Sequence, residues 1–134
     1  MLYVIDCSFS SAMFLPDEKS EEVRNFFKRR TPDDRIYIPI LWWYETVSVL
    51  NTSLKRDRIQ HTDAEETLAL FGAMRFITDS EYGTQFSKEL YELAQVYHVT
   101  PYDAVCLELT KRTKAKLKSH DENLLTAARK IGAI

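Results

Sequence analysis

Glycine is scarce in this chain, and its scarcity excludes several common kinds of functional site. Only three glycines occur among the 134 residues, Gly72, Gly83 and Gly132. A Walker A loop or a GxGxxG turn needs closely spaced glycines that let the backbone approach a phosphate, and neither can be formed here. A GxSxG nucleophile elbow is also absent. The sequence therefore excludes nucleotide binding through either glycine-rich turn, and serine hydrolase chemistry built on that elbow.

Cysteine and long apolar runs are equally sparse. The two cysteines, Cys7 and Cys106, lie 99 positions apart and form no CxxC pair, which excludes a zinc ribbon and a thioredoxin motif. Two isolated thiols predict a reducing compartment, and a buried disulfide between them is the alternative. No apolar run approaches the ~18 residues of a membrane span. The apolar run at 2–5 lacks the basic segment of a signal peptide, so we expect a cytoplasmic protein.

The charges of the chain nearly balance. Its 18 Lys and Arg residues oppose 20 Asp and Glu residues, which gives a net charge of −2. Such a balance is untypical of a dedicated nucleic-acid-binding protein, but local basic patches are compatible with it. The 45% of hydrophobic residues is that of a globular protein. The length and the lack of a linker predict one domain over residues 1–134.

Short apolar runs alternate with helical patterns along the chain. This alternation predicts an α/β fold, a three-layer sandwich with a short parallel sheet flanked by helices. Thr62 and Glu65 have the spacing of a capping box, and Lys116 and Lys118 suit an edge strand. The predicted strands are 2–5, 36–38, 76–78 and 115–118, with a further strand beginning at 132–134 as an option. The predicted helices are 8–15, 20–30, 41–56, 62–74, 84–97, 101–113 and 121–131.

Four acidic residues occupy positions where such a sheet presents functional groups. Ligands of parallel sheets bind beyond the carboxyl ends of the strands. Asp6 directly follows the first predicted strand, and Asp121 follows the run at 115–118. Glu45 and Asp103 have apolar neighbours at helical spacing. Each acid also has a structural interpretation: Asp6 and Asp121 as N-caps, Asp103 at the positive end of a helix dipole, and Glu45 at the solvent edge of an apolar stripe.

Four carboxylates that converge at one sheet edge would have a shared chemistry. Their charges repel one another, and a bound cation relieves that repulsion. Ligation by oxygen alone selects hard ions such as Mg²⁺ or Mn²⁺. Such ions hold phosphate oxygens and generate hydroxide for phosphodiester hydrolysis. The spacing of the acids is consistent with this convergence and does not establish it.

Four segments carry a resemblance to a known family. Residues 3–8 (Tyr-Val-Ile-Asp-Cys-Ser) and 100–104 (Thr-Pro-Tyr-Asp-Ala) are similar to motifs of the PIN-domain nucleases. Glu45 in the helix after Ile38-Pro39 resembles the single glutamate of that family, and residues 119–124 resemble its last acidic motif. The four motifs occur in the family's order over nearly the whole chain. Within the family, the chain most resembles the VapC-type toxins of toxin–antitoxin pairs.

The resemblance implies a metal-dependent endoribonuclease of the PIN-like fold. Asp6, Glu45, Asp103 and Asp121 would be both the catalytic residues and the ligands of Mg²⁺ or Mn²⁺, supported by Ser8 and Ser119. The implied partners are an RNA substrate, an antitoxin protein and a second copy in a homodimer. A catalytically inactive PIN-like module that binds RNA or protein is the alternative. A haloacid-dehalogenase-like phosphatase is disfavoured because Ser8 stands where that chemistry needs a second aspartate.

Basic side chains supply candidates for substrate contacts. Lys111, Arg112 and Lys114 lie between Asp103 and Asp121 in the sequence, in a segment without acids. Lys55 and Arg56 form a second cluster at the end of the helix that carries Glu45. Basic side chains beside a metal site suit phosphate contacts, which give affinity without sequence selectivity. The structural alternative for both groups is a solvated helix end.

Overall fold

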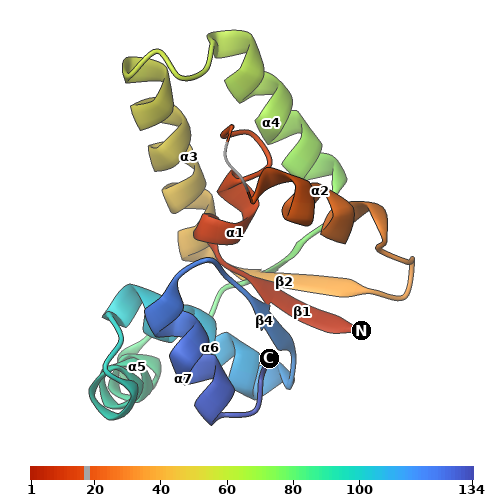
Figure 1. Ribbon diagram of the computed structural model, residues 1–134. Helices are drawn as coiled ribbons and strands as arrows, with labels where there is room; N and C mark the ends of the chain where they lie inside the picture. Colours follow the sequence, from red (N-terminus) through yellow and green to blue (C-terminus); the bar gives the residue numbers. More distant parts are fainter. Residues whose placement is uncertain (17–18) are drawn as a thin grey trace.

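The computed structural model describes residues 1–16 and 19–134 and is centred on a four-stranded sheet (Figure 1). The strands are β1 (Leu2–Ile5), β2 (Arg35–Pro39), β3 (Ile77–Asp79) and β4 (Lys116–Lys118). Their order is β3-β2-β1-β4, and every neighbouring pair is parallel. The predicted short parallel sheet is therefore confirmed, with β1 at its centre.

Helices cover both faces of this sheet, as predicted for a three-layer sandwich (Figure 1). Successive residues of a strand point to opposite faces. Val4 accordingly packs in a core formed with α5, α6 and α7, whereas Ile5 packs in a second core with α1, α2, α3 and α4. The helices are α1 (Cys7–Ser11), α2 (Ser20–Lys28), α3 (Ile40–Lys55), α4 (His61–Ala73), α5 (Thr84–Tyr97), α6 (Pro101–Thr113) and α7 (Glu122–Lys130).

β4 lies at the edge of the sheet, as predicted from Lys116 and Lys118. The side chain of Lys116 is exposed and that of Lys118 is half-exposed. Lysine on an edge strand discourages pairing with another chain. The optional strand at 132–134 is not formed in the described part of the chain. Instead, the backbone N–H of Leu117 donates a single hydrogen bond of 2.8 Å to the carbonyl of Ala133. The segment after α7 thus covers part of the β4 edge without extending the sheet.

The ends of α1 and α4 differ from those predicted by the sequence, and the predicted ends of α2, α3 and α7 shift by one or two residues. α1 ends at Ser11, four residues before the predicted end, and turns follow it. α4 begins at His61, and its capping box uses Gln60 and Asp63 rather than Thr62 and Glu65. Asp63 accepts a 2.8 Å hydrogen bond from the backbone N–H of Gln60. Both residue pairs have capping-box spacing, and the helix begins with the pair Gln60 and Asp63 rather than with Thr62 and Glu65. None of the described helices combines the length and apolarity needed to cross a bilayer.

The topology brings four segments together at the carboxyl edge of the sheet. β1 runs into α1 at this edge, β2 into α3, and β4 into the loop that precedes α7. α6 packs against β1 and β2 with its first turn toward the same end. Thr100 caps α6, since its hydroxyl accepts a 3.1 Å hydrogen bond from the N–H of Asp103, and Pro101 occupies the first turn.

Candidate active site

Asp6 leaves the carboxyl end of β1 and is 8% exposed. Its Oδ1 accepts a 2.9 Å hydrogen bond from the N–H of Phe9, so the side chain caps α1. Its own N–H donates to the carbonyl of Lys118 at 3.2 Å, which fixes it against the end of β4. The capping role and the position at the sheet edge, two separate interpretations of the sequence, hold together in the structure.

Two serines, predicted as supporting residues, bind the same carboxylate. Ser8 Oγ lies 2.7 Å from Asp6 Oδ1 and 2.9 Å from Oδ2. Ser119 Oγ donates to Asp6 Oδ2 at 2.5 Å. The two hydroxyl oxygens are 3.3 Å apart. Asp6 is thus held by three donors, two from the adjacent residues Ser8 and Phe9 and one from the distant Ser119, and its orientation is fixed.

Asp121 begins α7 beside these serines. Its Oδ1 accepts a 3.0 Å hydrogen bond from the N–H of Leu124, which makes it the N-cap. Its N–H donates to Ser119 Oγ at 2.9 Å, and the N–H of His120 donates to Ser8 Oγ at 2.9 Å. The loop 119–121 is therefore anchored to the end of β1 by hydroxyl groups.

Glu45 and Asp103 complete the group from two helices. Glu45 lies in the second turn of α3 and Asp103 in the first turn of α6, and both side chains are half-buried. Their neighbour Trp42 is buried, at 1% exposed, whereas Tyr44 is 70% exposed. The Trp-Trp-Tyr run before Glu45 therefore divides between the core and the solvent, and Glu45 sits on the boundary.

The four carboxylates lie close enough for their charges to interact. Burial is the largest cause that raises the pKa of Asp6, and the charge of Asp121 raises it further, against the hydrogen bonds from Ser119, Phe9 and Ser8. Burial raises the pKa of Glu45, and so do the charges of Asp6 and Asp103. Burial and the charges of Asp121 and Asp6 raise the pKa of Asp103, against the hydrogen bond with Thr100. The structure thus connects all four predicted acids electrostatically.

The donor chemistry of this group suits a hard divalent cation. Carboxylate and hydroxyl oxygens are the ligands that Mg²⁺ and Mn²⁺ prefer. Raised pKa values indicate negative charge that lacks compensation, which a cation would supply. Within residues 1–16 and 19–134, however, no three His, Cys, Asp or Glu side chains stand together as a ready coordination set. Binding of a cation would therefore require Glu45 or Asp103 to turn toward Asp6.

Both cysteines lie beside the acids and are free and buried. Cys7 Sγ lies 3.4 Å from Ser11 Oγ and 3.8 Å from Thr46 Oγ1. Burial raises the pKa of Cys106 well above its ordinary value, and the nearby carboxylates add to this effect. The alternative of a disulfide is not realised, and both thiols are held in their neutral form.

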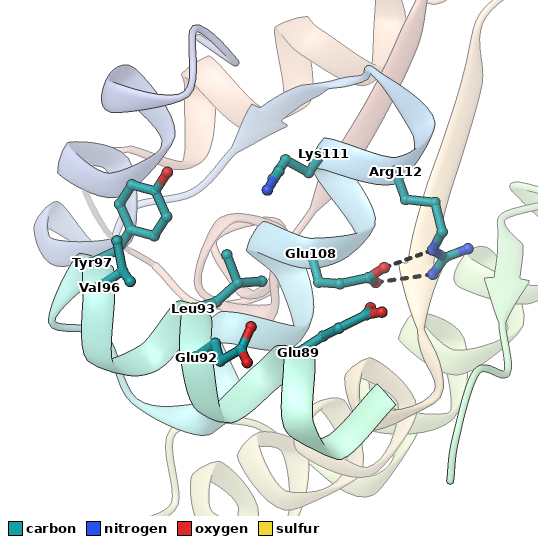
Figure 2. Close-up of a pocket in the computed structure, with 8 residues that line it drawn as sticks. All are labelled: Glu89, Glu92, Leu93, Val96, Tyr97, Glu108, Lys111 and Arg112. Atoms are coloured by element: carbon teal, nitrogen blue, oxygen red, sulfur yellow. Dashed lines mark hydrogen bonds and ion pairs between the residues drawn. The ribbon is translucent and has the colours of Figure 1, made fainter. Parts of the chain in front are cut away.

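The predicted substrate contacts of α6 lie away from the acids. Lys111 follows Asp103 by eight residues on the same helix, a separation of about 12 Å along the axis. Lys111 and Arg112 line a pocket of about 500 Å³ between α5 and α6 (Figure 2). Lys114 ends α6 in the left-handed conformation, with φ of 55°. The structure therefore does not bring these three residues to the acidic group.

Arg112 is occupied by two acidic partners. Its guanidinium binds Glu108 at 2.7 and 3.0 Å, the pair drawn in Figure 2, and it binds Asp79 at the end of β3 at 2.7 and 2.9 Å. The two carboxylates raise its pKa further above the ordinary value. The paired Arg112 side chain links α6 to the end of β3. Because two carboxylates already neutralise its charge, it is a poor candidate for binding a phosphate.

Lys55 and Arg56 are also remote from the acids. They are exposed at the far end of α3, ten residues or about 15 Å beyond Glu45. α3 and α4 extend away from the sheet at this end (Figure 1). Lys118 comes much nearer, because its carbonyl binds the N–H of Asp6. Lys118 ends the same acid-free basic segment that contains Lys111, Arg112 and Lys114, so the sequence already offers it as a phosphate contact.

Comparisons with known proteins agree with this architecture. The PIN domain family matches residues 3–130, and the chain belongs to this family. The crystal structure of PAE2754 from Pyrobaculum aerophilum is similar, with a TM-score of 0.72, 20% identity, and coverage of 95% of this chain and 84% of that one. The Mycobacterium tuberculosis VapC20, a sarcin-ricin loop cleaving toxin, has a TM-score of 0.69, 13% identity, and coverage of 93% and 94%. No curated protein sequence matches significantly.

Proposed function

We propose that this chain is a metal-dependent endoribonuclease that hydrolyses RNA phosphodiester bonds, the toxin of a VapBC-type toxin–antitoxin pair. One observation carries the proposal: in a chain of the PIN domain family, Asp6, Glu45, Asp103 and Asp121 interact electrostatically at the carboxyl edge of the sheet. The similarity to a VapC toxin that cleaves RNA supports the choice of substrate. The four carboxylates would serve both as catalytic residues and as metal ligands.

Within this site the acids would have different tasks. Asp6 is fixed by Phe9, Ser8 and Ser119, so it would provide a rigid reference point for a divalent ion. Glu45 and Asp103, with raised pKa values, are better proton acceptors at neutral pH than ordinary carboxylates. Either could take the proton of the attacking water. A bound Mg²⁺ or Mn²⁺ would supply charge stabilisation at the phosphate and lower the pKa of water.

The partners follow from the same assignment. A VapBC-type toxin would be held inactive by an antitoxin that covers the acidic site, and it would act in the cytoplasm as a homodimer. The exposed side chain of Tyr44, next to Glu45, lies at the edge of the site and is available for such a contact. Exposed aromatic residues are favoured in protein interfaces.

The decisive experiment is incubation of the purified chain with total RNA. Mn²⁺ or Mg²⁺ is added in one arm and EDTA in the other. The D6N/D103N variant removes two carboxylates while keeping the cap of α1, since Asn also caps helices. The E65Q/E66Q variant on the exposed surface of α4 is the matched control, because it loses the same charge elsewhere.

We expect metal-dependent RNA fragments from the wild type and from E65Q/E66Q, and none from D6N/D103N. Cleavage by D6N/D103N at the wild-type rate would refute the assignment of the acids. RNA binding without cleavage under any metal condition would instead favour the inactive PIN-like module. Discrete fragments would identify the RNA that is cut.

A further inference from the structure

A recess of about 340 Å³ lies between α2 and the β1–β4 edge of the sheet. Its volume is within the range of ligand pockets. Its aromatic wall is formed by Tyr3 and Phe26, whose rings meet edge to face with centroids 5.0 Å apart. The polar wall contains Asn25, Arg29 and Lys118. A recess with one aromatic and one basic wall can bind a ligand that combines a planar ring with an anionic group.

Two cations in this recess are available to such a ligand. Neither Arg29 nor Lys118 makes an ion pair within the described part of the chain. Lys118 Nζ lies 5.7 Å from the centroid of the Phe26 ring, a cation–π arrangement that holds it over the aromatic wall. Arg29 is exposed at the end of α2.

Two acids, Asp34 and Glu22, also line the recess, and Asp34 is engaged with the amino terminus. Asp34 accepts hydrogen bonds from the Met1 amino group at 2.7 Å and from the N–H of Thr31 at 2.8 Å. Glu22 Oε2 lies 3.7 Å from His120 Nε2. Three cations, Arg29, Arg30 and Lys118, thus outnumber the two acids around the open space, which suits an anion.

The recess shares a wall with the candidate active site. Phe9 lines the recess with its ring and binds Asp6 through its N–H. The His120 ring lies 5.1 Å from the Phe9 ring, while the N–H of His120 binds Ser8. Lys118 lines the recess and binds Asp6 through its carbonyl. The recess therefore adjoins the residues that hold Asp6 in place.

We propose that this recess binds one nucleotide of the single-stranded RNA that flanks the cleaved bond. Lys118 would leave the ring of Phe26 and bind the phosphate of this nucleotide together with Arg29. The base would take the place of Lys118 on the Phe26 ring, and Asn25 would hydrogen-bond the base edge. Unstacked bases of single-stranded RNA are recognised in this way by aromatic and amide side chains. The inference rests on the proposed function, and it adds a binding site beyond the four acids.

An RNA strand fits these features better than an acidic peptide. A carboxylate-rich segment would use Arg29 and Lys118 but would leave the face of Phe26 without a planar partner. An acidic peptide as the true occupant is one outcome of the following test.

The test measures binding of a fluorescent single-stranded oligoribonucleotide by anisotropy, in EDTA so that no cleavage occurs, over a series of salt concentrations. Each phosphate contact on a single strand contributes about 0.7 to the slope of log K against log salt. Because both side chains would bind the same phosphate, the R29A/K118A variant should lower this slope by about 0.7 and weaken binding roughly tenfold. F26L should weaken binding about tenfold with the slope unchanged, because it removes stacking and no charge.

R129A/K130A is the matched control, since it removes two exposed charges from the last turn of α7, at the opposite end from Asp121. Circular dichroism verifies that each variant is folded. If R29A/K118A and F26L bind RNA as R129A/K130A does, the proposal is wrong. If an acidic peptide binds the wild type but not R29A/K118A, and RNA binding is the same in both, the recess is a peptide site and the proposal is wrong. Wild-type protein that neither binds nor cleaves RNA would instead refute the proposed function.

Discussion

Ser119 donates a hydrogen bond of 2.5 Å to Asp6, across 113 positions of the sequence. The bond joins the end of the edge strand β4 to the end of the central strand β1. The same hydroxyl accepts the N–H of Asp121, so one serine orients two acids. A buried carboxylate without such donors would be costly. The orientation of the acids and the attachment of the end of β4 to the end of β1 therefore both depend on Ser119.

The variant S119A should destabilise the fold and weaken the site together. It removes a charge-assisted hydrogen bond from the buried Asp6 carboxylate, at a cost of about 1–3 kcal/mol in the free energy of unfolding. The pKa of Asp6 should rise further, because the side-chain hydrogen bond that opposes burial is lost. Urea denaturation measures the stability. S48A, on the exposed surface of α3, is the control and should leave it unchanged. Equal stability of the two variants would contradict this role.

Without metal, the protein should lose stability as the pH rises from about 4. Asp6, Glu45 and Asp103 have pKa values raised in the folded state. Between the ordinary value of about 4 and the raised value, the folded state binds more protons than the unfolded one, so the free energy of unfolding falls with increasing pH. Above the raised values the loss is complete. D6N should show a shallower decline, since it removes one titrating group and its charge from two others.

Thermal unfolding in EDTA at a series of pH values measures this difference. E65Q serves as the control because its side chain is exposed. A D6N profile parallel to that of the wild type would show that the carboxyls are not coupled as described.

Divalent cations should restore the stability that the acids cost. A ligand at 100 times its dissociation constant stabilises the folded state by about 2.7 kcal/mol. Titration with Mn²⁺ at pH 7.5 should therefore raise the melting temperature of the wild type. The increase should be much smaller for D6N/D103N, and smaller at pH 5, where protons compete for the carboxylates. Equal increases for wild type and D6N/D103N would place the bound ion elsewhere.

Arg112 should prove to be structural rather than a substrate contact. R112A leaves Glu108, which is 7% exposed, without its partner and releases Asp79. Because the guanidinium is itself partly exposed, we expect a loss of about 1–2 kcal/mol in the free energy of unfolding. RNA affinity should stay close to that of K111A, the neighbouring loss of one charge. If R112A loses RNA binding but keeps the stability of the wild type, Arg112 contacts the substrate and this prediction is wrong.

Residue patterns were sufficient for the parallel sheet and the layers, because buried strands such as Leu2–Ile5 read as continuous apolar runs and the helices between them are amphipathic. The order of the four acids along the chain was consistent with one group, but the packing of α3 and α6 against the sheet is what brings them together. Helix ends were less certain, since the choice between Gln60–Asp63 and Thr62–Glu65 depends on fine differences in capping geometry.

The substrate contacts were the part that sequence could not supply. Lys111 and Lys114 are near Asp121 in the chain, but α6 carries them about a helix length away from the acids. The ion pair of Arg112 with Asp79 could not be predicted, because the two residues are 33 positions apart in the sequence. Conversely, Arg29 and Lys118 lie far apart in the sequence, and only the packing of α2 against the sheet edge unites them.

The strand order β3-β2-β1-β4 also bears on synthesis of the protein. β1 is translated before its neighbour β4 and before the residues Ser119 and Asp121. A nascent chain holding only the first hundred residues has Asp6 and Glu45 without Asp103, Ser119 or Asp121. The acidic site therefore assembles only after the chain has been translated through Asp121, and any shorter nascent chain carries an incomplete group of acids.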